Sequence, residues 1–317
     1  MNAISNFSTH NASTVTWPLF PRQVQFDWQH SPFHWIPNDP FASHWINHFS
    51  FSLVRGEYFF CRTFNKALPE IRDEKMLADV KTFIRQEAIH AQAHKESIEQ
   101  YLQKYGVDIE ANYARVVQLF DKLLADKPLG YELPKALRKE WLLIRVALVA
   151  AAEHFTAGFG HYVLCNSHWE ARGADPMVSD LFTWHSAEEV EHRTVAYDLY
   201  QHLSGNYLRR SLVMLAVAPM LTYLMAAGAE QLAQVDHDMP KDQRSMKSIG
   251  FWRAWRDSAK EYRVPGPTWF LTKSLSFFKP SYHPYYEAST ELAVNYINQS
   301  PAVLAAQQHT TTVELSA

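Results

Sequence analysis

The sequence predicts an all-α protein, a four-helix bundle with additional C-terminal helices. Helix signals dominate the chain, and the apolar/polar alternation of β-strands is hard to find. Glutamate and histidine residues also form a repeat, in which a single Glu is followed by a Glu-x-x-His pair. The first copy is Glu57 with Glu87 and His90, and the second is Glu153 with Glu189 and His192. The gaps from 57 to 87 and from 153 to 189 each fit a helix, a turn and a returning helix at ~1.5 Å per residue.

The first half of the chain divides into an arm and three helices. Residues 1–37 form an irregular, proline-punctuated N-terminal arm. Asp39-Pro40 supplies an N-cap and a first-turn proline for a helix that runs towards Leu68-Pro69. A second helix begins near Asp73 and ends before Gly106, and a shorter one covers 109–126.

The second half contains two further bundle helices and an extension. Pro134 opens the third long helix, and Asp175-Pro176 opens a fourth that is predicted to reach Gly205. Beyond it lie an apolar segment at 211–229 and a polar linker at 236–248. Aromatic helices are predicted at 250–262, 268–278 and 286–299. We therefore expect a bundle over 38–205 and a helical extension over 206–317 that packs on it.

The segment 211–229 carries no charged residue and nearly meets the roughly 18-residue length of a membrane span. Pro219 interrupts it. We expect a buried helix or two short ones packed on the bundle. The alternative is insertion into a membrane or contact with its surface, and surface contact would make the protein peripheral to the inner membrane.

Composition excludes several classes of protein. The chain has 317 residues and a formal net charge of −3, and its Lys and Arg residues are scattered, which argues against nucleic-acid binding. Two cysteines cannot form a disulfide framework and fit a reducing compartment. No export signal is visible at the N-terminus, so we expect a cytoplasmic protein.

The repeated pattern predicts a site for two metal ions inside the bundle. Residues three apart share a helix face, so each Glu-x-x-His pair projects from one side of its helix. Glu153 lies in the apolar run 146–155, where an uncompensated carboxylate would cost several kcal/mol. A bound cation would remove that cost. The competing interpretation is a set of buried salt bridges or exposed charges.

Spacing suggests how the ligands divide. Glu87 and Glu153 are the expected bridging carboxylates, with Glu57 and His90 completing one metal and Glu189 and His192 the other. His185 lies four residues before Glu189 and would be a third imidazole on the second metal, or else a supporting donor or core histidine.

Three further residues stay open at this point. Glu188 could replace Glu189 as a ligand, although Glu189 copies the spacing of Glu87 and His90. His94 and Tyr58 are expected in the pocket or in the layer behind the ligands.

The longer motifs resemble known families. The paired pattern resembles the ferritin-like di-iron carboxylate superfamily, and over about residues 25–300 the chain resembles a bacterial family described as predicted metal-dependent hydrolase. The residues that carry this resemblance are Arg55, Glu57, Arg85, Glu87, His90, His94, the segment 185–192 and the segment 196–198. The triplet His185, Glu189 and His192 is also similar to di-iron arylamine N-oxygenases. That resemblance implies a ligand set of Glu57, Glu87, His90, Glu153, His185, Glu189 and His192.

Four carboxylates with imidazoles and no thiolate favour two iron ions, with manganese or a mixed iron/manganese pair as alternatives. The first functional hypothesis is an O2-activating oxidoreductase, an oxygenase (monooxygenase) or oxidase, that acts on an apolar or aromatic small molecule with O2 as co-substrate and an external electron donor. Metal-dependent hydrolysis by activated water is the second hypothesis, and a ferroxidase or iron-binding protein is the third. A homodimer is also expected.

Overall fold

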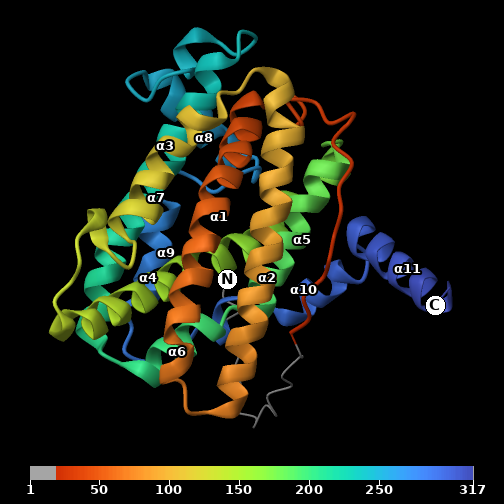
Figure 1. Cartoon of the computed structure of the whole chain (residues 1–317). Coiled ribbons are helices and arrows are strands. Elements are labelled where there is room, and N and C mark those ends of the chain that lie inside the picture. Colours follow the sequence, from red (N-terminus) through yellow and green to blue (C-terminus); the bar gives the residue numbers. More distant parts are fainter. Residues whose placement is uncertain (1–18, 317) are drawn as a thin grey trace, which may run out of the picture.

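The computed structural model describes residues 19–316, and this part of the chain is all-helical, which confirms the predicted fold class. Four long helices surround the predicted ligands, and they are α1 (Pro40–Ala67), α2 (Glu74–Gln100), α4 (Lys135–Tyr162) and α5 (Pro176–His192). The arm, of which residues 1–18 lie outside the described part, runs beside α2 and α5 (Figure 1).

The predicted helix starts are confirmed by their caps. The carboxylates of Asp39, Asp73 and Asp175 each accept a hydrogen bond from the backbone N–H three residues later, at 2.9, 2.7 and 2.9 Å. Proline occupies the first position of α1 and of α5, where its missing N–H costs no hydrogen bond. These short-range signals fix where the bundle helices begin.

Short irregular helices join and extend the long ones. A 3₁₀ turn, Leu102–Tyr105, follows α2 and ends at Gly106, whose φ of 74° suits glycine. The helix predicted at 109–126 consists of α3 (Ile109–Val117) and a π-helical turn (Gln118–Leu123). A second π-helical turn, Val163–Ser167, extends α4.

The prediction of one helix from 176 to 205 was wrong. The chain breaks after α5 and resumes as α6 (Val195–Leu203). The Arg193 guanidinium donates to the carbonyl of Val190, which an unbroken helix would offer to the N–H of Thr194. The same guanidinium donates to the Thr290 hydroxyl at 3.0 Å, which connects the break between α5 and α6 to the C-terminal region.

The apolar segment 211–229 belongs to one continuous helix, α7 (Tyr207–Val235), with Pro219 inside it. A Cβ on Gly228 would lie 1.8 Å from the His48 ring, so glycine is what allows α7 to approach α1 so closely. By length and composition α7 and the segment 135–167 could each cross a membrane, but 56% and 72% of their most apolar windows are buried inside the protein. Core helices of soluble proteins show the same pattern.

The C-terminal part adds four helices, which are α8 (Ile249–Lys260), α9 (Trp269–Phe277), α10 (Thr290–Ile297) and α11 (Pro301–Ser316). Short 3₁₀ turns also occur at Leu68–Glu70, Pro128–Gly130, Glu170–Arg172, Lys241–Gln243 and Pro284–Glu287. The sequence did not predict α11, which projects from the body (Figure 1). One hydrophobic core runs from Trp28 in the arm to Val303, through all three predicted regions.

Candidate metal centre

All seven predicted ligands lie buried in the bundle interior. Their donor atoms form two groups, each with donor atoms within 4.8 Å of one another. The first group contains Glu57, His90, His185 and Glu189, and the second contains Glu87, Glu153, Glu189 and His192. Helix α1 contributes Glu57, α2 contributes Glu87 and His90, and α4 contributes Glu153. Helix α5 contributes His185, Glu189 and His192.

In the first group two imidazoles lie face to face around carboxylate oxygens. The rings of His90 and His185 stack with centroids 4.3 Å apart. His185 Nε2 lies 2.8 Å from Glu189 Oε1 and 3.4 Å from Glu57 Oε1. His90 Nδ1 lies 3.4 Å from the same oxygen of Glu189. One carboxylate oxygen is therefore the centre of this group.

In the second group His192 Nε2 faces three carboxylates. It lies 3.2 Å from Glu87 Oε1, 3.4 Å from Glu153 Oε2 and 3.4 Å from Glu189 Oε2. Glu189 thus directs one oxygen to each group. The spacing argument instead made Glu87 and Glu153 the bridging pair and separated Glu189 from Glu57, because it could not register α5 against α1.

Close packing of α4 on α5 brings the second group together. A Cβ on Gly160 would lie 2.4 Å from the Ser186 carbonyl oxygen, so only glycine allows the two backbones to approach this closely. This contact holds the helix of Glu153 beside the helix of Glu189 and His192.

The site fits a pair of cations because many of its buried polar atoms have no hydrogen-bond partner. Among the described residues these atoms include Oε1 and Oε2 of Glu57 and of Glu87, Glu153 Oε2, Glu189 Oε2, His90 Nδ1, and Nδ1 and Nε2 of His192. Buried polar groups in proteins are normally paired, and each orphan costs about 1–3 kcal/mol. Divalent cations would satisfy the carboxylate and imidazole donors together.

The pKa values describe a site that holds protons when it holds no cation. Burial raises the pKa of Glu57 and Glu87 well above the ordinary value, and it raises that of Glu153 to about 7. Burial opposes ionisation of Glu189 too, but His192 and its neighbours lower its pKa well below 4.5. Burial likewise opposes a charge on His192, yet Glu189 and Glu153 raise its pKa to about 10. Cations would compete with these protons.

Glu188 lies outside both groups and supports His90 from behind. Its Oε2 lies 3.0 Å from His90 Nε2, and its Oε1 accepts hydrogen bonds from Trp184 Nε1 at 3.0 Å and from Arg22 at 2.9 Å. His90 is therefore held with Nδ1 towards Glu189. Glu191 also lies outside both groups and pairs with the same Arg22 guanidinium at 2.8 Å. Between the two acidic neighbours, the structure places Glu189 at the centre and Glu188 behind it.

His94 also lies behind the ligands. Its Nε2 lies 2.6 Å from His185 Nδ1, and its Nδ1 lies 3.0 Å from the hydroxyl of Ser50. These two contacts orient the His185 ring so that its Nε2 faces Glu189. Tyr58 is partly buried against the hydrophobic core and lies outside both groups.

Sequence reasoning missed the supporting residues Arg22, Ser50 and Trp184. Trp184 and Glu188 are one helical turn apart on α5, a spacing that could have indicated their contact. Arg22 is 166 residues from Glu188 in the chain, and the sequence carries no signal for that pairing.

A narrow apolar cavity of about 60 Å³ reaches the first group, and Glu57 is its only ionisable lining residue. Its walls are Trp45, Phe49, Ser52, Leu53, Gly56, Phe60, Phe120, Ala152, Phe155, Thr156, Phe159, Leu221, Leu224, Met225 and Phe270. The Thr156 hydroxyl donates to Glu153 Oε1 at 3.3 Å, so this wall also contacts the second group. The volume admits a small molecule or one apolar chain end.

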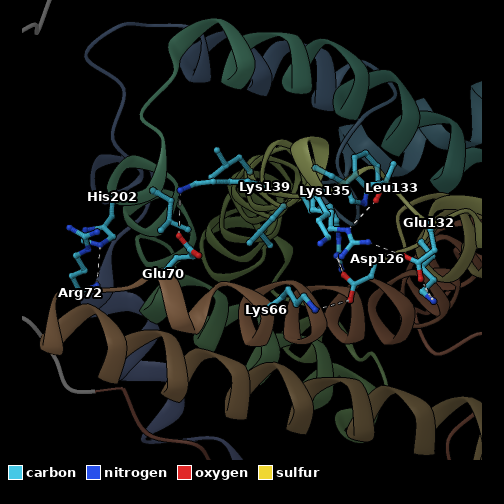
Figure 2. Close-up of a pocket in the computed structure, with 16 residues that line it drawn as sticks. Lys66, Glu70, Arg72, Asp126, Glu132, Leu133, Lys135, Lys139 and His202 are labelled. Carbon is cyan, nitrogen blue, oxygen red and sulfur yellow. Dashed lines mark hydrogen bonds and ion pairs between the residues drawn. The ribbon is translucent and has the colours of Figure 1, made fainter.

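A larger cavity of about 900 Å³ lies elsewhere, on the surface between the ends of α1 and α6 and the start of α4 (Figure 2). Its walls are charged and its acidic side chains are paired, as Glu70 is with Lys139 at 3.5 Å and Asp126 with Lys66 at 4.0 Å. None of the candidate cation groups in the described part of the chain lies here. We call this cavity the charged cleft.

Comparison with known proteins gives a family and no closer relative. The family model described as predicted metal-dependent hydrolase matches residues 20–288, most of the chain, and the chain belongs to this family. Comparison with curated proteins and with solved structures found no significant match. The match covers α1 to α9 and therefore every residue of the two groups.

Proposed function

We propose that this member of the predicted metal-dependent hydrolases is a two-metal enzyme, with Glu189 between the two ions. Glu57, His90 and His185 would hold one ion, and Glu87, Glu153 and His192 the other. The observation that carries the proposal is the set of buried carboxylate and imidazole atoms that have no hydrogen-bond partner in the described part of the chain. A ferritin-like bundle is the architecture that we propose for this arrangement.

Metal-dependent hydrolysis is the reaction that the family description supports, and the apolar cavity favours a small apolar substrate. Bound cations would supply a Lewis acid and lower the pKa of a coordinated water. The chain's own residues would orient the ligands and the substrate. Arg22 and Glu188 hold the His90 ring, Ser50 and His94 hold the His185 ring, and the apolar cavity would bind the substrate beside Glu57.

The donor chemistry favours a second candidate, an O2-activating oxidoreductase that uses two iron ions, or manganese, with an external electron donor. Four carboxylates and three imidazoles without a thiolate are a hard to borderline ligand set. Neither cysteine belongs to the groups, and Cys61 donates to the Ile84 carbonyl instead. The apolar cavity suits O2 and a hydrocarbon group as well as it suits an apolar ester.

Reconstitution in parallel separates these functions. Metal-free protein would be loaded with Zn(II) or, without oxygen, with Fe(II), and elemental analysis should give two core ions per chain. Turnover of aryl and acyl esters by the Zn(II) form, with no O2 uptake by the Fe(II) form, supports hydrolysis. O2 uptake that depends on a reductant and an apolar substrate supports the second candidate, and uptake with Fe(II) alone indicates a ferroxidase. Absence of core metal contradicts every version.

We also propose that α7 contacts a membrane surface. Its exposed residues Leu208, Leu212 and Leu215 project at helical spacing, and Leu271 and Leu275 of the adjacent α9 are exposed as well. The same two helices line the apolar cavity, so a lipid surface would lie near its entrance. Sedimentation with anionic vesicles should carry the protein down, and Leu212→Glu with Leu215→Glu should abolish it. A cytoplasmic homodimer stays a prediction that gel filtration can test.

A further inference from the structure

A third cluster of ligand-type side chains lies away from the two core groups. It consists of His34 from the arm, His44 on α1 and Asp236 at the C-terminal end of α7. His34 Nε2 lies 2.6 Å and His44 Nε2 lies 2.7 Å from the same carboxylate oxygen, Oδ2 of Asp236. Three segments far apart in the chain therefore direct one donor atom each to one point.

At that point both imidazoles now hydrogen-bond Asp236 Oδ2, and the other atoms of the cluster would not compete with a cation for it. Asp236 Oδ1 accepts the backbone N–H of Asp238 at 2.9 Å, which fixes the carboxylate with Oδ2 towards the imidazoles. His44 Nδ1 is buried and has no hydrogen-bond partner among the described residues. No donor to Nδ1 in this part of the chain therefore keeps the ring proton on Nε2, and Nε2 could give up that proton to bind a cation.

Burial gives the cluster one open side. The side chains of His44 and Asp236 are 1% and 3% exposed, whereas that of His34 is 31% exposed. Phe33 packs against the His44 ring with centroids 4.6 Å apart and closes another side. A cation could enter past His34 and keep one water on that side.

We propose that His34, His44 and Asp236 form a separate binding site for one divalent transition-metal ion such as Zn²⁺. Two imidazoles and one carboxylate with a free fourth position are a common zinc ligand set. Binding would replace the two hydrogen bonds and move the donors apart to about 3 Å, the edge of a coordination shell with bonds of ~2 Å.

The ion would fasten the arm to the bundle. The same arm carries Arg22, which bonds Glu188 and Glu191 on α5, and Ser31, which bonds Asp175 at 3.1 Å. Metal at this site would therefore hold the arm in the position in which Arg22 supports His90 through Glu188. The ion would take no part in the reaction in the core and would affect it only through the position of the arm.

Metal counting on the full-length protein tests the proposal. Metal-free protein would be titrated with Zn²⁺ in competition with a chromophoric chelator. A second titration would use Co²⁺, whose visible absorption is strongest when the ion is four-coordinate. We expect one more ion in the unmodified chain than in His34→Gln or Asp236→Asn, and the loss of one Co²⁺ spectral component in both variants. His30→Gln, a change at an exposed arm residue, should keep the full count.

A second comparison keeps the core site separate. Glu189→Gln should lose the core ions and retain the ion at His34, His44 and Asp236. Equal metal counts and Co²⁺ spectra in the unmodified chain, His34→Gln and Asp236→Asn would overturn the proposal, because the cluster would then be a hydrogen-bonded triad only. Circular dichroism of each variant confirms that it is folded before its metal is counted.

Discussion

The metal centre and the charged cleft both gather many ionisable side chains, yet they differ in what surrounds those charges. In the cleft the partners are exposed to water, as in Lys139 with Glu70, whose side chains are 69% and 50% exposed. In the metal centre the ligand side chains are at most 5% exposed, and many of their polar atoms have no hydrogen-bond partner among the residues described.

A high density of charged side chains therefore does not by itself indicate a cation site. Exposed ion pairs contribute about 0–1 kcal/mol each, because water solvates the ions whether or not they pair. Buried carboxylates have no such alternative and depend on protons, imidazoles or metal. The charged cleft is also far larger than the apolar cavity at the metal centre, so size does not mark the site either.

The largest expected effect comes from Glu189→Gln, which keeps the side-chain volume and removes the charge that both groups share. We expect at least a ~100-fold loss of affinity for both core ions, since the effect of removing a ligand exceeds that of removing a supporting residue. Calorimetric metal titration measures it. Glu70→Gln in the charged cleft is the matched control, and equal metal affinities for the two variants would show that Glu189 is not a ligand of the core ions.

A buried group with satisfied partners should affect pH dependence instead of metal binding. His154 lies 2.8 Å from the Tyr282 hydroxyl and 3.0 Å from the Lys273 carbonyl oxygen, and burial lowers its pKa to about 4. Below about pH 6.5 the His154 imidazole therefore takes up a proton in the unfolded chain but stays neutral in the folded chain until the pH approaches 4. The contribution of His154 to stability is full above that pH and falls by about 1.4 kcal/mol per unit towards pH 4.

His154→Gln should accordingly unfold more easily at pH 7.5, by about 1–3 kcal/mol from its lost hydrogen bonds, and lose less stability than the unmodified chain on going to pH 5. Urea unfolding of metal-free protein at both pH values measures the difference. His202→Gln, a change at an exposed histidine of the charged cleft, should follow the unmodified chain at both values. Parallel curves for His154→Gln and the unmodified chain would contradict this account.

Arg22→Gln tests whether the arm sharpens the metal centre. Without the guanidinium, Glu188 loses a charged partner at 2.9 Å and holds the His90 ring less firmly. Because partners behind a ligand commonly change metal affinity 10- to 100-fold, we expect about a 10-fold loss at the ion nearest His90. Arg138→Gln in the charged cleft is the control. Unchanged affinity in Arg22→Gln would mean that Glu188 orients His90 without the arm.

The smallest expected effect is that of Lys139→Ala. It breaks the exposed pair with Glu70 at 3.5 Å, which should change the free energy of unfolding by less than about 0.5 kcal/mol. Thermal unfolding at low and high salt measures it. A loss above 1 kcal/mol, or a change in core metal content, would show that the cleft and the metal centre are energetically linked.

The helical class, the capped starts of α1, α2 and α5, and the candidate ligands could all be predicted from the order of the residues. These features depend on short-range physics: an aspartate caps its own helix, and residues three or four apart share a face. The same reasoning failed at Arg193, whose guanidinium bonds the nearby Val190 carbonyl and the distant Thr290 hydroxyl.

Packing between the helices makes Glu189 the carboxylate that both groups share. Glu189 faces both groups because Gly160 lets α4 and α5 approach closely and because α1 and α2 present Glu57 and Glu87 to opposite oxygens. The contact of Arg22 with Glu188 and the meeting of His34, His44 and Asp236 also depend on how the arm lies against the bundle. Helical periodicity fixes which face a residue occupies, whereas packing between helices fixes what that face meets.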